Sequence, residues 1–201
     1  MTMKNVYDIP LEIAAISRHL APHLAPHTRA GAFTKQNRQP RENESYTNLL
    51  VSLLVFDILA NQGIICQLEL VARVDHCLDL SLRHRGQYVT AHIKSSTSAP
   101  YRDDLHLFIK QEEIAKPVDI YMQVFVHDFS EDHHGSPHVH IPGWLTRNGP
   151  QWKRHVGRIQ DIPGCVDQRG LAIPLSELRP LKSLLDIVDH APGRRGNDKG
   201  A

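Results

Sequence analysis

The sequence predicts an α/β or α+β domain in which helices flank a central mixed β-sheet. A helical spacing of apolar residues runs through residues 42–62, and period-two alternation dominates much of residues 64–144. A second helical pattern lies near the carboxyl end of the chain. Because a run of strands lies between helices, we expect the helices to pack on one sheet.

The N-terminal part of the chain combines two predicted helices with a segment that lacks a periodic pattern. Apolar spacing predicts a helix over Leu11–Leu20, and the following Ala21–Gln39, rich in proline and basic residues, is typical of an extended arm. The strongest helical pattern is Glu42–Gln62, which Gly63 ends. The expected organisation is a helix and arm over residues 1–40, one domain over residues 41–190 and a disordered tail over residues 191–201.

The middle of the chain carries the strand patterns. Apolar side chains alternate with polar ones, as they do in half-buried strands. The expected strands are Ile64–Val74, Leu78–Leu82, Val89–Ile93, Val118–Val126 and Val139–Trp144. In the fourth of these we expect Val118, Ile120, Met122, Val124 and Val126 to share one face. Residues Leu178–Val188 are the predicted C-terminal helix.

Two of these strands form a predicted hairpin around His84-Arg85-Gly86-Gln87. Glycine favours the positive φ that such a turn requires. If Arg85-Gly86 is the two-residue loop, Asp79 lies opposite His92, and Cys77 lies opposite Lys94, with these polar side chains on one face.

This polar face suggests hydrolytic chemistry. A carboxylate beside a second ligand can hold a divalent cation, and a nearby lysine can help to activate water for attack on a phosphodiester. The alternative is a solvated sheet face with an ordinary Asp–Lys pair, which is common on exposed strands.

The order of motifs resembles the PD-(D/E)xK, or restriction-endonuclease-like, nuclease superfamily. Asp79 and His92-Ile93-Lys94 are similar to its aspartate and its acid-x-lysine, and the helix that ends at Gly63 is similar to its glutamate-bearing first helix. Val118–Val126 resembles its later core strand. Ile141–Arg147 and Ile173–Leu181 resemble closing segments of uncharacterised phage and prokaryotic members, so that the likeness spans most of Glu42–Val188.

The resemblance implies a restriction-endonuclease-like core and a metal-dependent endonuclease that hydrolyses DNA. Asp79 and Glu44, with Glu42 as the rival of Glu44, would hold the cation, and Lys94 would be the catalytic lysine. His92 stands where the family has an acid or an amide, and it would join or tune the site. The expected cofactor is Mg²⁺ or Mn²⁺, with Zn²⁺ as an alternative because imidazole is a poor Mg²⁺ ligand.

Two other functions remain open. One is a nuclease-like binding or scaffold module that has lost catalysis and serves a mobile-element or defence complex. The other is a histidine-rich metal-binding protein, because 14 of the 201 residues are histidine and several lie between His127 and His140. Within that stretch His138 and His140 share a strand face and form the better candidate pair.

Composition limits the partners that this chain can have. Lys and Arg number 23 against 22 Asp and Glu, so a surface for DNA must be local, and a homodimer or protein complex is left open. Candidate phosphate contacts are Arg38, Arg41, Arg83, His84, Arg85, Lys153, Arg154 and Arg158, and Trp144 and Trp152 are candidates for base stacking, although Trp144 is expected to pack beside its strand. Three dispersed cysteines and no long apolar run favour a cytoplasmic protein without a membrane span.

Overall fold

The computed structural model describes residues 6–27, 38–70, 78–96, 105–127, 138–162 and 169–189, with the backbone alone at residues 69–70 and 78–79. The expected disordered tail, Cys77 and the interior of the polar loop between His127 and His138 lie outside the described residues. No helix of the described residues is long and apolar enough to span a bilayer.

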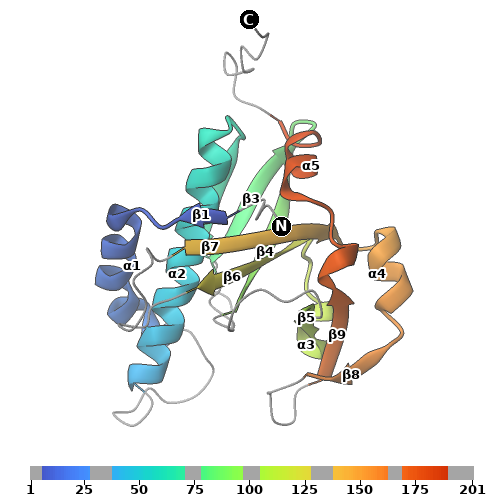
Figure 1. Ribbon diagram of the computed structural model, residues 1–201, viewed down its shortest axis with the longest axis horizontal. Coiled ribbons are helices and arrows are strands. Elements are labelled where there is room, and N and C mark those ends of the chain that lie inside the picture. Colours follow the sequence, from blue (N-terminus) through green and yellow to red (C-terminus); the bar gives the residue numbers. More distant parts are fainter. Residues whose placement is uncertain are drawn as a thin grey trace, which may run out of the picture.

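A curled, mixed β-sheet of six strands forms the centre of the fold (Figure 1). Its neighbours are antiparallel except for β4 and β6, which run parallel, so the predicted mixed α/β architecture is confirmed. In spatial order the strands are β1 (Val6–Asp8), β7 (His138–Thr146), β6 (Ile120–His127), β4 (Gln87–Ser96), β3 (Leu78–His84) and β2 (Cys66–Leu70).

A second, antiparallel sheet of three strands lies beside the main sheet (Figure 1) and was not predicted. Its strands, in spatial order, are β5 (His106–Lys110), β9 (Arg169–Pro174) and β8 (Ile159–Asp161). Two short helices accompany it, α3 (Gln111–Ile114) and α4 (Pro150–His155). Leu107, Ile109, Leu171 and Ile173 are fully buried in a hydrophobic core with Tyr121 of β6, so the small sheet belongs to the same folded unit.

Helices α1 (Leu11–Leu24) and α2 (Arg38–Asn61) pack on the other face of the main sheet. Gly63 has a φ of 79°, and its amide donates to Ala60, so α2 ends where the sequence predicts. The first helix is four residues longer than predicted and continues into the 3-10 turn Ala25–His27, because Ala21 and Ala25 are buried. An extended arm is therefore wrong for Ala21–His27, and also for Arg38 and Gln39, which belong to α2.

The β3–β4 hairpin has the predicted turn and register. Arg85 and Gly86 have φ values of 51° and 80°, as a two-residue turn of the I′ type requires, and Ser81 pairs with Thr90. The amides of both turn residues donate to the Asp189 carboxylate, at 2.9 and 2.8 Å. A carboxylate from the end of the described chain thus holds the turn.

Two details of the later elements differ from the prediction. Val118 lies before β6 and packs in the hydrophobic core between the small sheet and Tyr121, which we call the second core. Strand β6 itself is buried on both faces rather than on one. The C-terminal helix is only α5 (Leu181–Leu185), preceded by the 3-10 turn Leu175–Glu177. Pro180 disfavours a helical conformation at Arg179, which instead pairs with Trp144 of β7.

Candidate functional site

Strand β4 carries polar side chains to both faces of the main sheet. Its parallel register places His92 beside Tyr121 and Lys94 beside Gln123 of β6. Since side chains alternate along a strand, His92 and Lys94 share the face of the second core, whereas Ser95 points to α2. His92 and Gln123 are each only 4% exposed, so a solvated sheet face is not what forms here.

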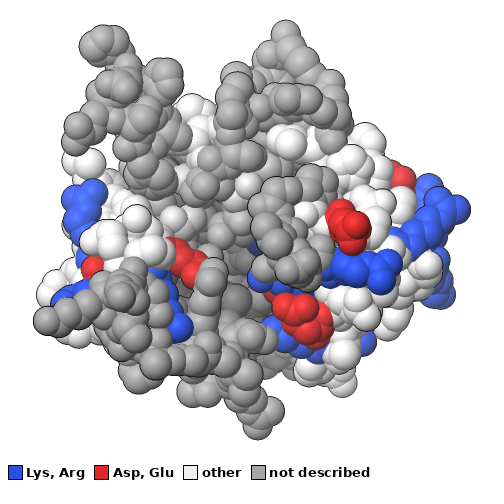
Figure 2. Space-filling model, turned by 90° about the horizontal axis from the view of Figure 1, so that it is seen from below, with Lys and Arg blue, Asp and Glu red and all other residues white. Residues whose placement is uncertain are grey.

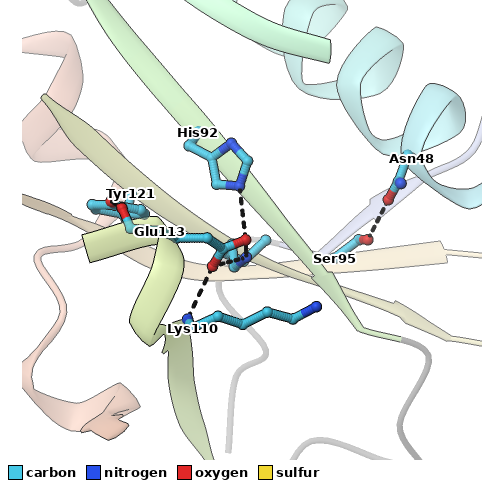
Figure 3. A network of polar contacts seen from close by, with 7 residues as sticks. Asn48, His92, Ser95, Lys110, Glu113 and Tyr121 are labelled. Atoms are coloured by element: carbon cyan, nitrogen blue, oxygen red, sulfur yellow. Dashed lines mark hydrogen bonds and ion pairs between the residues drawn. The ribbon is translucent and has the colours of Figure 1, made fainter. Parts of the chain in front are cut away.

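The Glu113 carboxylate of α3 lies at the centre of this face (Figure 3). Lys94 Nζ donates to both of its oxygens at 2.6 Å, and His92 Nε2 lies 3.8 Å from Oε1. The exposed fraction of the side chain is 5% for His92, 16% for Lys94 and 10% for Glu113. We call these three residues the polar cluster.

Electrostatics keep Glu113 ionised despite its burial. Desolvation on its own would raise the pKa of the Glu113 carboxyl, because burial penalises the charged form. The charge and hydrogen bonds of Lys94, the charge of His92 and the hydrogen bond from the Lys110 amide together outweigh desolvation, so the pKa of Glu113 lies below its ordinary value. The polar cluster therefore contains a genuine buried ion pair near neutral pH.

Backbone and aromatic contacts hold the short helix of Glu113 in place. The Lys110 amide donates to Glu113 Oε2 at 3.0 Å. The carboxylate of the third helical residue thus caps the start of α3. The Tyr121 hydroxyl donates to the Glu113 carbonyl at 3.1 Å, and its ring stacks on Trp152 at 5.5 Å and meets His92 edge-on. Local capping and tertiary packing together aim the carboxylate at Lys94.

The predicted site residues are only partly brought together. His92 and Lys94 lie in the polar cluster, and the described hairpin register, continued by one pair, sets the Asp79 backbone opposite His92. The Asp79 side chain lies outside the described atoms.

The two candidate helix acids belong to the opposite side of the main sheet. Asn48 accepts a hydrogen bond from Ser95 at 3.0 Å, on the far side of β4 from Glu113 (Figure 3). Glu44 lies one helical turn before Asn48 on α2, and Glu42 pairs with Arg38 at 2.7 Å. The carboxylate beside Lys94 is thus Glu113, not a helix acid of α2.

Sequence reasoning missed Glu113, and only a weak local signal marks it. It follows the alternating run that forms β5, and it stands three residues after Lys110, the spacing of a capping box. Among the described residues, no group of three or more His, Cys, Asp or Glu side chains is positioned, as it stands, to hold a metal ion.

Three other histidines lie together at the ends of β6 and β7. His127 pairs with His138, and their rings stack with centroids 5.2 Å apart. Burial first, and then the neighbouring His138, lowers the pKa of His127. Burial, His127 and His138 lower the pKa of His140 in the same way. The predicted pair His138 and His140 is therefore part of a larger group.

The candidate nucleic-acid contacts are dispersed. Arg38 and Arg41 lie at the start of α2, Arg83–Arg85 at the hairpin, and Lys153, Arg154 and Arg158 in and after α4. In Figure 2, Lys and Arg gather on the side where Figure 1 places α4 and β8, with Asp and Glu among them. One such pair is Arg154 with Glu177 at 2.9 Å.

Both tryptophans are buried, with exposures of 0% for Trp144 and 3% for Trp152. Trp144 packs beside its strand, as predicted, and its Nε1 donates to the Pro180 carbonyl at 3.1 Å. Trp152 stacks on Tyr121 inside the second core, so base stacking by Trp152 is not what its position favours.

Comparison with known proteins gave no match: no family model, no curated protein and no solved structure is similar enough to this chain to report.

Proposed function

We propose that this chain is a metal-dependent endonuclease with a restriction-endonuclease-like core, and that it hydrolyses DNA phosphodiester bonds at the polar cluster. The observation that carries the proposal is the buried Glu113 carboxylate, which lies 2.6 Å from Lys94 and 3.8 Å from His92. The resembled motif has an acid two residues before the lysine, and His92 stands at that position in this sequence. Glu113 supplies that carboxylate from another element.

The donor set suits a divalent cation. Glu113 offers carboxylate oxygens and His92 an imidazole nitrogen, and Asp79 is the proposed third ligand from the neighbouring strand. Mixed oxygen and nitrogen donors favour Mn²⁺ or Zn²⁺ over Mg²⁺, which prefers oxygen alone. When bound, the cation would polarise the scissile phosphate and its attacking water.

Lys94 provides the second part of the chemistry. Its ammonium is held by both oxygens of Glu113 in a site with little solvent, which fixes its position on β4. A fixed cation at this position stabilises negative charge that develops on a phosphate oxygen in the transition state. Gln123, the register partner of Lys94 on β6, is buried.

The test is a cleavage assay on single-stranded, duplex and branched DNA with Mg²⁺, Mn²⁺ and Zn²⁺ in parallel. We expect cleavage with Mn²⁺, and losses of about a hundredfold or more for Lys94→Met and Glu113→Gln. Glu112→Gln is the matched control, because Glu112 is the exposed neighbour of Glu113 on α3. Cleavage that survives both substitutions in folded protein contradicts the proposal.

A second candidate is a nuclease-like module that has lost catalysis and binds nucleic acid or protein. What favours it is that Glu113 engages Lys94 with both oxygens, which leaves the ammonium committed to an ion pair. The discriminating variant is His92→Glu, which restores the acid of the resembled motif. Mg²⁺-dependent cleavage by His92→Glu, with an inactive wild type, selects this second function.

A further inference from the structure

The three histidines at the ends of β6 and β7 are arranged by the sheet register. His127 and His138 are directly paired, and Asp8 of β1 is the partner of His138 on its other side. Directly paired residues of antiparallel strands share a face. His140 is two residues from His138 on the same strand and therefore points to that face as well. Three imidazoles and one carboxylate thus belong to a single face of three adjacent strands.

These side chains are also near one another in space. The rings of His127 and His138 stack at 5.2 Å, and His140 interacts electrostatically with both. All three histidines are half-buried, and Asp8 at the edge strand is exposed. Opposed pairs have Cβ atoms about 5 Å apart, and Asp8 and His127, on either side of His138, are separated by two strand spacings, about 10 Å. His138 lies between them, and rotation about side-chain bonds is the motion that would turn the four groups toward one centre beside it.

Imidazole nitrogens are the common ligands of divalent ions late in the first transition series, and Zn²⁺ takes four ligands in a tetrahedron. We propose that His127, His138 and His140 bind one such ion, represented by Zn²⁺, with Asp8 as the fourth ligand. The rings lie stacked rather than converged in the described arrangement. The proposed site forms by side-chain rotation on a backbone that already holds the correct register.

The proposed zinc site is separate from the polar cluster. Gln123, the register partner of Lys94, lies two residues before Phe125, the partner of His140, and four residues before His127. These offsets are about 7 and 13 Å along β6. A bound ion would join β1, β7 and β6 at the left-hand ends of β6 and β7 in Figure 1. Since β1 has only three residues and lies at the sheet edge, the ion would anchor the start of the described chain.

The experiment measures zinc by mass spectrometry after dialysis of the full chain, in a Glu113→Gln background that weakens the proposed nuclease site. We expect one zinc ion per chain, a rise in the melting temperature on loading, and at least a tenfold loss of affinity in His127→Asn and in His140→Asn. Asp8→Asn is expected to weaken binding less, because water can replace one oxygen ligand. The control is His19→Asn with His23→Asn, since both side chains are exposed on α1.

Several results overturn the proposal. One is protein that binds no stoichiometric zinc; another is zinc retained by the folded His127→Asn, His140→Asn double variant. Zinc that is lost only when His133 and His134 are replaced also overturns it. The ligand set can also be tested without substitution of the histidines, by loading the protein with Co²⁺. Tetrahedral Co²⁺, which the proposal requires, absorbs strongly in visible light, and octahedral Co²⁺ does not. None of these measurements depends on nuclease activity, so a protein without nuclease activity still tests the zinc site.

Discussion

The two faces of the main sheet bury side chains of different chemistry. The face under α2 is packed by Leu50, Leu54, Leu80 and Met122, all 2% exposed or less. On the other face, Gln123 and the Tyr121–Trp152 stack are 4% exposed or less, and the polar cluster is less enclosed, with the Lys94 side chain 16% exposed.

The two faces place different demands on their neighbours. Apolar burial stabilises a sheet without further requirements, whereas a buried ion pair is stable only if its partners stay matched. Replacement of a buried ion pair by apolar residues is often neutral or stabilising, so packing alone does not explain the polar cluster. The proposed function therefore belongs to the polar face, and the following variants test the comparison of the two faces.

The largest effect is expected from Glu113→Ala, which leaves the Lys94 ammonium buried without its carboxylate. The expected loss in the free energy of unfolding is about 3–5 kcal/mol. The double variant Glu113→Met, Lys94→Met should recover most of that loss, because no charge then remains to be matched. Urea denaturation of the three proteins measures the difference, and a double variant as unstable as the single one contradicts the ion-pair account.

On the apolar face, Leu50→Ala is expected to cost about 3 kcal/mol, since Leu50 is fully buried and its removal leaves a cavity. Unlike Glu113→Ala, this loss should not be recovered by a second substitution that removes a charge. Adding the pair Glu113→Met, Lys94→Met to Leu50→Ala should leave the cost of Leu50→Ala unchanged, and a smaller cost would show that the two faces are not independent.

The pH dependence of stability separates the faces more finely. The pKa of Glu113 is lower in the folded chain than its ordinary value of 4.5, so its stabilisation is fully present above that value. It is lost as the pH falls through the folded pKa. When the pH is lowered from neutral to acidic, the urea midpoint of the wild type should therefore fall further than that of the Glu113→Met, Lys94→Met variant. Parallel curves would contradict the lowered pKa.

The smallest effect is expected from Tyr121→Phe, which removes the hydroxyl that donates to the Glu113 carbonyl at 3.1 Å. The expected loss is about 1 kcal/mol, typical of one hydrogen bond. The ring still stacks on Trp152, so near-ultraviolet circular dichroism should stay unchanged. A loss above that of Leu50→Ala would show that the hydroxyl orders α3 as a whole.

Local patterns were sufficient for the hairpin and for the end of the main helix, although α2 begins at Arg38, four residues before the predicted Glu42. The alternation in Leu78–Leu82 and Val89–Ile93, with Arg85-Gly86 between them, predicted a register with Asp79 opposite His92, and the observed pair Ser81 with Thr90 belongs to that register. Gly63 marked the end of α2 correctly. Such features depend on neighbours in the sequence, and the backbone conformation that glycine favours is a local property.

Long-range contacts were beyond the same patterns. Pro180 could have shortened the predicted C-terminal helix, but the pairing of Arg179 with Trp144 joins distant segments. The small sheet likewise pairs β5 with β9, whose residues lie about sixty positions apart, as Phe108 with Ala172 shows (172 − 108 = 64). Period-two patterns of only a few residues do not name their partners.

By itself the sequence determined which residues of β3 and β4 face each other, where α2 ends, and that His92 and Lys94 share a face. The identity of the carboxylate beside Lys94, in contrast, depends on tertiary contacts. Glu113 reaches it because the capped α3 is held by Tyr121, a contact that crosses the two sheets. The same holds for Asp8 and the histidines, which only strand pairing brings into one row. The reason is physical: periodicity fixes the direction of a side chain, whereas packing fixes its partner.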